Sequence, residues 1–84
     1  MQKAYTNQIK QFGSEIKRLR ESLSLTQQEL SDRCDIDIRT IQRIERGEHG
    51  VGLQILIALA VSLETTPSDL LSKLKIPAAG KPRF

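Results

Sequence analysis

Three arginines stand at regular intervals in the short segment DIRTIQRIERG, which also holds three isoleucines. The cations lie four and three residues apart: Arg39, Arg43 and Arg46. On a helix that turns about 100° per residue they fall within roughly 60° of one another, with Ile41 and Ile44 on the opposite face. Arginine presents a planar fork of donors that fits guanine edges and phosphates, and a helix about 10 to 12 Å wide fits the major groove of DNA. The spacing indicates a helix that is anchored by isoleucines and offers its arginines to a nucleic acid.

The alternative is an ordinary solvated face of an amphipathic helix. Such faces usually mix charges of both signs in pairs four residues apart, whereas the acids of this segment, Asp37 and Glu45, fall outside the arginine face. All three cations are also arginine rather than lysine. We therefore favour a binding surface over a solvated one.

Composition limits the chain to one small domain. It has 84 residues, of which 38% are hydrophobic, and its formal net charge of +3 is too small by itself to establish a polyanionic partner. Nothing at the N-terminus resembles a signal peptide, and the longest apolar stretch, residues 53–63, is shorter than the roughly 20 residues that span a bilayer. A single cysteine cannot form an internal disulfide. These features predict a cytoplasmic protein without membrane contact.

Residues suited to catalysis or metal binding are scarce. An enzyme would need a nucleophile with a base, paired carboxylates or a metal cluster, and the single histidine, His49, beside Glu48 in a glycine-rich loop, offers none of these. Cys34, four residues after Leu30, fits a small core residue better than a redox sensor. We predict no enzyme activity, no cofactor and no metal site.

The elements that would position the arginines are short helices. Apolar side chains recur at intervals of three and four from near the start of the chain: Tyr5, Ile9, Phe12, Ile16, Leu19 and Leu23. This spacing predicts a helix over about residues 6–23. Gly13 inside it costs roughly 1 kcal/mol relative to alanine, so residues 1–11 are interpreted as an N-terminal extension or a frayed helix start.

Capping signals divide the next segment into two helices. Thr26 and Glu29 match a capping box, which predicts a helix over about residues 27–34. Asp37 is a candidate N-cap for a helix over about residues 38–46. Gly47 can end that helix because glycine readily adopts a positive φ.

Two further helices are predicted in the last third of the chain. The first covers residues 53–63 and has an apolar face of five residues: Leu53, Leu56, Leu59, Ala60 and Leu63. Thr66 as N-cap, Pro67 at the first helical position and Asp69 completing a capping box predict a last helix that ends near residue 74. Because no run alternates apolar and polar residues, the predicted fold class is all-α, with five helices. Residues 75–84 are interpreted as a flexible tail.

The segment LTQQELSDRCDIDIRTIQRIERG, residues 25–47, resembles the helix-turn-helix of the lambda-repressor-like proteins, the XRE family. The positions that match the family pattern are Thr26, Gln27, Glu29, Leu30, Ile36, Thr40, Ile41, Arg43, Ile44, Glu45 and Gly47. The resemblance extends over residues 12–74 and implies a compact five-helix DNA-binding domain. Asp35 and Ser31 stand where the family has a turn glycine and a close-packed alanine. Aspartate tolerates the left-handed conformation and serine is nearly as small as alanine, so neither departure threatens the motif.

The resemblance implies a role for each surface residue of the motif. Base edges would be read by four residues of the second helix: Ile38, Arg39, Arg43 and, nearer the rim, Gln42. For Ile38, packing against the protein is the open alternative. Phosphates would be held by four others: Thr26, Gln27, Thr40 and Arg46. Arg20 and Glu45 match a salt bridge that ties the first helix to the reading helix. The acids Asp32, Asp35 and Asp37 would repel phosphates, so we expect Asp37 to be used for capping and the other two to lie off the DNA footprint.

Together, the residues and the resemblance predict a sequence-specific regulator that binds double-stranded DNA. Apolar residues beyond one core face recur on the last two helices and just after them: Ile55, Ile57, Val61, Leu70, Leu71, Leu74 and Ile76. They are either additional core or the symmetric contact of a homodimer, and we favour the dimer. The alternatives are a DNA-binding antitoxin with a toxin partner, a restriction-modification controller and, less favoured, a protein–protein adaptor without DNA binding.

Overall fold

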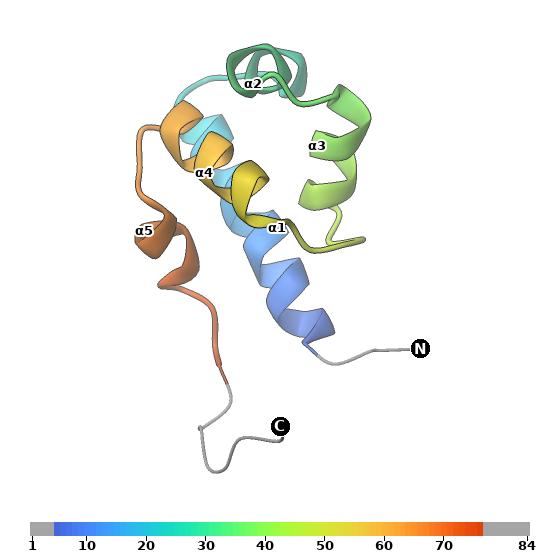
Figure 1. Cartoon of the computed structure of the whole chain (residues 1–84), viewed down its shortest axis with the longest axis vertical. Helices are drawn as coiled ribbons and strands as arrows, with labels where there is room; N and C mark the ends of the chain where they lie inside the picture. The colour runs from blue at the N-terminus through green and yellow to red at the C-terminus, as the bar shows by residue number, and fades with distance from the viewer. Residues whose placement is uncertain (1–4, 77–84) are drawn as a thin grey trace.

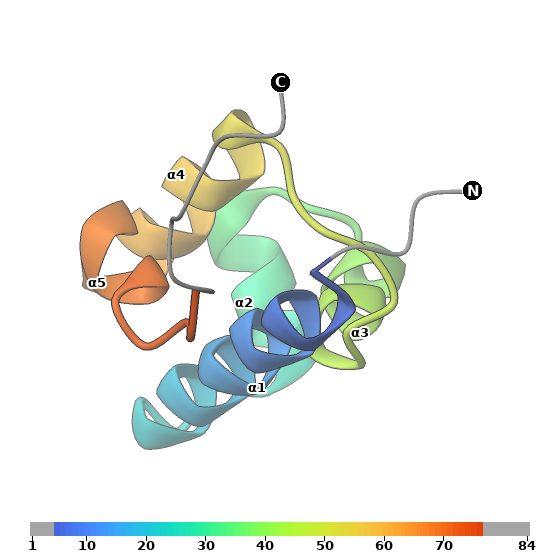
Figure 2. The ribbon, with the colours of Figure 1, turned by 90° about the horizontal axis from the view of Figure 1, so that it is seen from below.

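The computed structural model describes residues 5–76, and in that range the chain forms five α-helices and no strand. The helices are α1 (Thr6–Ser22), α2 (Gln27–Cys34), α3 (Ile38–Glu45), α4 (Leu53–Ser62) and α5 (Pro67–Leu71). In Figures 1 and 2, α1 lies between α3 on one side and α5 on the other. Contacts join α1 to α3 and α5, α2 to α3 and α4, and α4 to α5. The all-α prediction is confirmed.

One hydrophobic core joins the helices. Its buried side chains come from all five of them and from the residue after α4: Phe12, Ile16, Leu30, Ile41, Ile44, Leu59, Ala60, Leu63 and Leu70. Burying each large aliphatic side chain contributes about 1.5–3 kcal/mol. The predicted apolar face is confirmed for Phe12 and Ile16, which are buried, and for Leu19 and Leu23, which are partly buried against the core. Tyr5 is 62% exposed and precedes the helix. The core therefore forms where helices from both halves of the chain converge.

Gly13 lies where α1 crosses α3. A Cβ at this position would clash with the carbonyl oxygen of Ile44 and would lie 3.1 Å from the carbonyl oxygen of Glu45. The glycine therefore permits a close approach of two helix backbones, which the helix-weakening interpretation overlooked. Residues 6–11 form the first turns of α1, which runs through Gly13 without a break. Residues 1–4 of the predicted extension lie outside the described range.

The capping predictions hold for α2 and require corrections elsewhere. The Thr26 hydroxyl accepts from the Glu29 amide, and the Glu29 carboxylate accepts from the Thr26 amide, which is the predicted capping box. Asp37 occupies the N-cap position of α3, but its side chain makes no capping hydrogen bond. Thr66 caps α5 through the Asp69 amide, whereas the Asp69 carboxylate accepts from the Thr65 hydroxyl at 3.4 Å.

The end of the chain differs most from the sequence prediction. Leu53, assigned to the inner face of α4, is 70% exposed, and α5 ends at Leu71 rather than near residue 74. Because α4 is apolar around its whole circumference, its periodicity could not identify the buried side. The predicted tail is described only for residues 75 and 76. No described helix is both long enough and apolar enough to cross a membrane.

Candidate nucleic-acid interface

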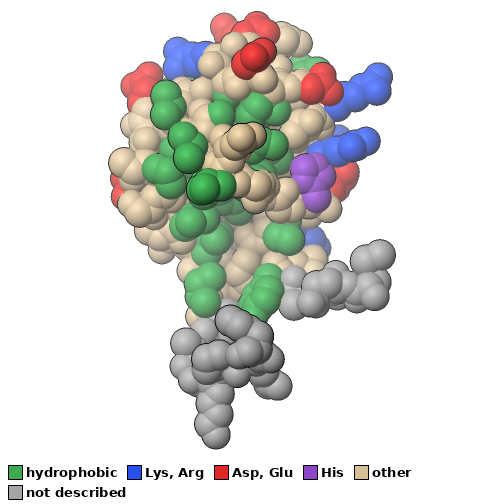
Figure 3. All heavy atoms as spheres, in the orientation of Figure 1, with side chains coloured by type: hydrophobic (Ala, Val, Ile, Leu, Met, Phe, Trp, Pro, Cys, Tyr) green, Lys and Arg blue, Asp and Glu red, His purple; other side chains and the backbone are tan. Residues whose placement is uncertain are grey.

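The arginine face of α3, formed by Arg39, Arg43 and Arg46, is exposed. Ile41 and Ile44 on the opposite side are 0% and 1% exposed. The predicted division of the helix is therefore present, with isoleucines inside and arginines outside. In Figure 3, Lys and Arg side chains project from the edge of the molecule that α3 forms in Figure 1.

Two of the three arginines form no salt bridge with another residue of the described range 5–76. Among residues 5–76, neither Arg39 nor Arg43 has an acidic partner in a salt bridge, whereas Arg46 Nε donates to Glu48 Oε2 at 2.6 Å. This hydrogen bond holds the pKa of Glu48 below its usual value and that of Arg46 above its own. The arginine face therefore does have an acid beside it, from the loop after the helix, which spacing within the helix did not reveal. Both side chains are exposed, so the pair is screened by salt and open to exchange with a phosphate.

A buried ion pair fixes α3 against α1. Arg20 Nε donates to Glu45 Oε2 at 2.6 Å and Arg20 Nη2 to Glu45 Oε1 at 3.0 Å, with the two side chains 9% and 3% exposed. Arg20 Nη1 also donates to the carbonyl oxygen of Leu25 at 2.7 Å, before α2. The hydrogen bond to Glu45 raises the pKa of Arg20 above its ordinary value. One guanidinium thus joins α1, the turn before α2, and α3.

Gln27, predicted to contact a phosphate, is half-buried, and its side chain is hydrogen-bonded within the protein. Its Nε2 donates to Glu45 Oε1 at 3.0 Å, and its Oε1 accepts from Gln42 Nε2 at 3.4 Å. The two glutamines therefore extend the buried ion pair outward to the rim of the arginine face. Neither contact was signalled by the sequence, because it depends on the packing of α2 on α3.

The remaining predicted contact residues border the arginine face. Ile38 and Thr40 are half-buried on α3, and Thr26 is exposed at the start of α2. The Thr26 hydroxyl oxygen is used as an acceptor by the cap, which leaves its O–H free to donate to an anion. Of the nearby acids, Asp32 accepts from Gln28 at 3.0 Å.

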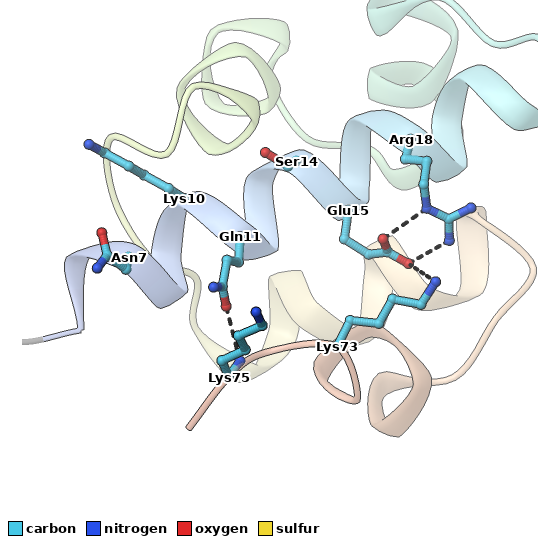
Figure 4. Close-up of a pocket in the computed structure, with 8 residues that line it drawn as sticks. All are labelled: Asn7, Lys10, Gln11, Ser14, Glu15, Arg18, Lys73 and Lys75. Carbon is cyan, nitrogen blue, oxygen red and sulfur yellow. Dashed lines mark hydrogen bonds and ion pairs between the residues drawn. The ribbon is translucent and has the colours of Figure 1, made fainter. Parts of the chain in front are cut away.

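A second cationic surface lies on the outer side of α1 and was not predicted. This basic groove, shown in Figure 4, has a volume of about 560 Å³ and is lined by Asn7, Lys10, Gln11, Ser14, Glu15, Arg18, Lys73 and Lys75. Its one carboxylate, Glu15, accepts two hydrogen bonds from Arg18 and lies 3.9 Å from the Lys73 ammonium. These contacts lower the pKa of Glu15, chiefly through the Arg18 hydrogen bond. Gln11 and Gln8 bond the backbone of Lys75, so the groove joins parts of the chain that lie far apart in the sequence.

Cys34 and His49 are the residues that the sequence analysis weighed for chemistry. No group of three or more His, Cys, Asp or Glu residues that could hold a metal ion occurs in the described part of the chain. The Cys34 thiol donates to the carbonyl oxygen of Leu30, and burial raises its pKa. A thiol with a raised pKa is a poor nucleophile at neutral pH.

Comparison with known proteins agrees with this geometry. The helix-turn-helix family model matches residues 16–70, which contain the buried pair, α2, α3 and α4. The chain therefore belongs to the XRE helix-turn-helix family of DNA-binding transcriptional regulators. No curated protein matches it.

Several solved structures share the fold. The restriction-modification controller protein C.AhdI from Aeromonas hydrophila is 29% identical, with a TM-score of 0.72 over 79% of this chain and 98% of that one. The competence regulator ComR from Streptococcus vestibularis is 30% identical, with a TM-score of 0.74 over 83% of this chain but only 24% of ComR. The clp gene regulator ClgR from Corynebacterium glutamicum, at 20% identity and a TM-score of 0.73 over 77% of this chain and 69% of that one, supports the fold alone.

Proposed function

We propose that the chain is a cytoplasmic, homodimeric transcriptional regulator that binds a palindromic operator in double-stranded DNA, with α3 in the major groove. The observation that carries the proposal is the exposed arginine face on a helix whose other side is fully buried. A helix held in this way can present its side chains to base edges in a fixed orientation.

Base reading is assigned to two residues of the arginine face, Arg39 and Arg43. Arg39 and Arg43 have no salt-bridge partner among residues 5–76, so their guanidinium groups are available for bidentate contacts with guanine. Gln42, held by Gln27, lies at the rim, and half-buried Ile38 fits contact with a thymine methyl group.

Phosphate contacts are assigned to residues around Arg39 and Arg43. Arg46 would exchange Glu48 for a phosphate, and the Thr26 hydroxyl would donate to another. Gln27 and Thr40 are also assigned to phosphates of the DNA backbone, although Gln27 must then give up or share its hydrogen bond to Glu45.

The test begins with selection of bound sites from random duplex DNA. A palindrome with half-sites about one helical turn, roughly 34 Å, apart would support both base reading and a dimer. Arg43→Ala should then lose affinity selectively at one base position, by about 1–3 kcal/mol. Arg46→Ala should weaken all sequences alike and reduce the salt dependence.

Arg33→Ala is the matched control, because Arg33 lies on α2 and is not part of the arginine face. Its guanidinium donates to the carbonyl oxygen of Ser62 and pairs with the carboxylate of Glu64. Equal losses on cognate and random DNA for Arg43→Ala would refute the assignment of base reading. Failure of the wild-type protein to enrich any sequence would refute the proposed function.

A role as a restriction-modification controller is a second candidate. It is favoured by the match to C.AhdI, because the match covers 98% of that protein's length. Operator sites located upstream of the restriction and methylation genes of the same genome would support this role. A toxin as protein partner is the remaining alternative, and co-purification of a small protein from the native host would reveal it.

A further inference from the structure

The basic groove between α1 and the segment after α5 has an excess of positive charge. Four cations line it, Lys10, Arg18, Lys73 and Lys75, against one carboxylate, that of Glu15. Arg18 and Lys73 both lie against this carboxylate, whereas Lys10 and Lys75 form no ion pair with another residue of the range 5–76. Within the described part of the chain, the charge of these two lysines is therefore not balanced by an acid.

Hydrogen bonds hold the two walls of the basic groove together. Gln11 Oε1 accepts from the Lys75 amide at 3.0 Å, and Gln8 Nε2 donates to the Lys75 carbonyl oxygen at 2.6 Å. On the α1 wall, the Arg18 guanidinium donates to both oxygens of Glu15, at 2.9 and 2.6 Å. The backbone that carries Lys75 is therefore fixed against α1, which gives the groove a definite shape.

The cations are spread along the groove. In Figure 4, Asn7 and Lys10 lie toward one end of the α1 wall and Arg18 at the other. From Asn7 to Arg18 the helix rises about 16 Å, a distance that an extended chain covers with about five residues. Where two cations do converge, the carboxylate of Glu15 already occupies the space between them. The spacing therefore suits several separate negative charges better than one compact anion, which needs convergent donors.

The polar side chains between the cations suit a polypeptide. Asn7, Gln11 and Ser14 line the groove, and amide and hydroxyl groups both donate and accept, as the N–H and C=O groups of an extended peptide require. Phosphate oxygens of a nucleic acid can only accept. No aromatic side chain is among the residues that line the groove, so the bases of a single strand would have no ring to stack on.

We infer that the basic groove binds an extended acidic segment of a partner protein. Side chains on alternate residues of such a segment point to the same side, about 7 Å apart, so its carboxylates can pair with successive cations of the groove. The inner side of α3 packs on α1, and the arginine face points away from it. A segment in the groove therefore leaves the arginine face uncovered, and the regulator can hold DNA and the partner together. This last step rests on the proposed role of α3.

The first test uses a defined probe, a fluorescein-labelled peptide of alternating glutamate and glycine, about ten residues long so that it spans the groove. Fluorescence anisotropy measures its affinity in about 0.1 M salt, where charges are screened beyond about 10 Å. Lys73→Glu and Lys75→Glu should each weaken binding about tenfold, because an attraction is replaced by a repulsion. Lys17→Glu is the matched control, since Lys17 is exposed on α1 but does not line the groove. It changes the net charge equally and should weaken binding less than about twofold.

Two further measurements separate the groove from other cationic surfaces and from nucleic acid. Arg43→Ala should leave the affinity for the peptide unchanged, and an oligothymidine of equal charge should bind more weakly than the peptide. A peptide that does not bind, or that is weakened equally by Lys17→Glu or Arg43→Ala, would overturn the inference. Tighter binding of the oligothymidine, sensitive to Lys75→Glu, would also overturn it and make the groove a nucleic-acid site. A protein that binds the peptide through Lys75 but enriches no DNA sequence would refute the proposed function alone.

Discussion

Replacing Gly13 by alanine is expected to destabilise the protein, against the usual effect of this change within a helix. Helix propensity alone predicts a gain of about 1 kcal/mol. The added Cβ, however, would meet the carbonyl oxygens of Ile44 and Glu45, and backbone atoms cannot move aside as the end of a side chain can. Overpacking of this kind costs about 1–3 kcal/mol. Because the clash with Ile44 is severe, we expect a net loss of about 1–2 kcal/mol.

Urea unfolding followed by circular dichroism measures this change, and a domain of this size shifts its Tm by about 4–8 °C per kcal/mol. Ser14→Ala, at the next and exposed position of α1, is the control and should gain a few tenths of a kcal/mol. If Gly13→Ala were more stable than the wild type while Ser14→Ala behaved as expected, the close approach of α1 and α3 would be wrong. DNA affinity should fall together with stability, since the same shift would move α3.

Three further predictions concern buried charge, backbone conformation and pH. Arg20→Met should lower the free energy of unfolding by about 3–5 kcal/mol, because it leaves the Glu45 carboxylate buried without its partner. Adding Glu45→Met to this variant should recover part of the loss. Equal losses for the single and the double variant in a urea titration would contradict the argument. Asp35, with φ 54°, should be replaceable by glycine with a gain of about 0.5 kcal/mol, seen as a higher Tm. Arg18 lowers the pKa of Glu15 below its ordinary 4.5, so this carboxylate stabilises the fold above that pH and less as the pH falls through the lowered pKa. The stability difference between wild type and Glu15→Gln should therefore shrink on acidification, and a constant difference would count against the ion pair.

Local signals in the sequence were sufficient to predict much of α3 and its neighbour α2. The capping box at Thr26 and Glu29 involves residues three apart, so the start of α2 could be predicted without knowing the fold. The inward direction of Ile41 and Ile44 followed from helical periodicity, because the other side of α3 is strongly polar.

Features that depend on packing could not be predicted in this way. Leu53 was assigned to the core because α4 is apolar on every side, and only its neighbours determine which side is buried. The Arg46–Glu48 pair depends on the path of the loop after α3. The basic groove depends on contacts such as that between Gln11 and Lys75, which are 64 residues apart. Sequence spacing carries no information about such distances.

The buried pair between Arg20 and Glu45 also has a thermodynamic consequence. Because it joins α1, α3 and the turn before α2 in the free protein, the orientation of α3 is fixed during folding. The conformational entropy of ordering that helix is therefore lost before DNA arrives, and association has less disorder to remove. Calorimetry of operator binding should show a heat-capacity change that reflects surface burial at the DNA contact, without the larger change that accompanies coupled folding.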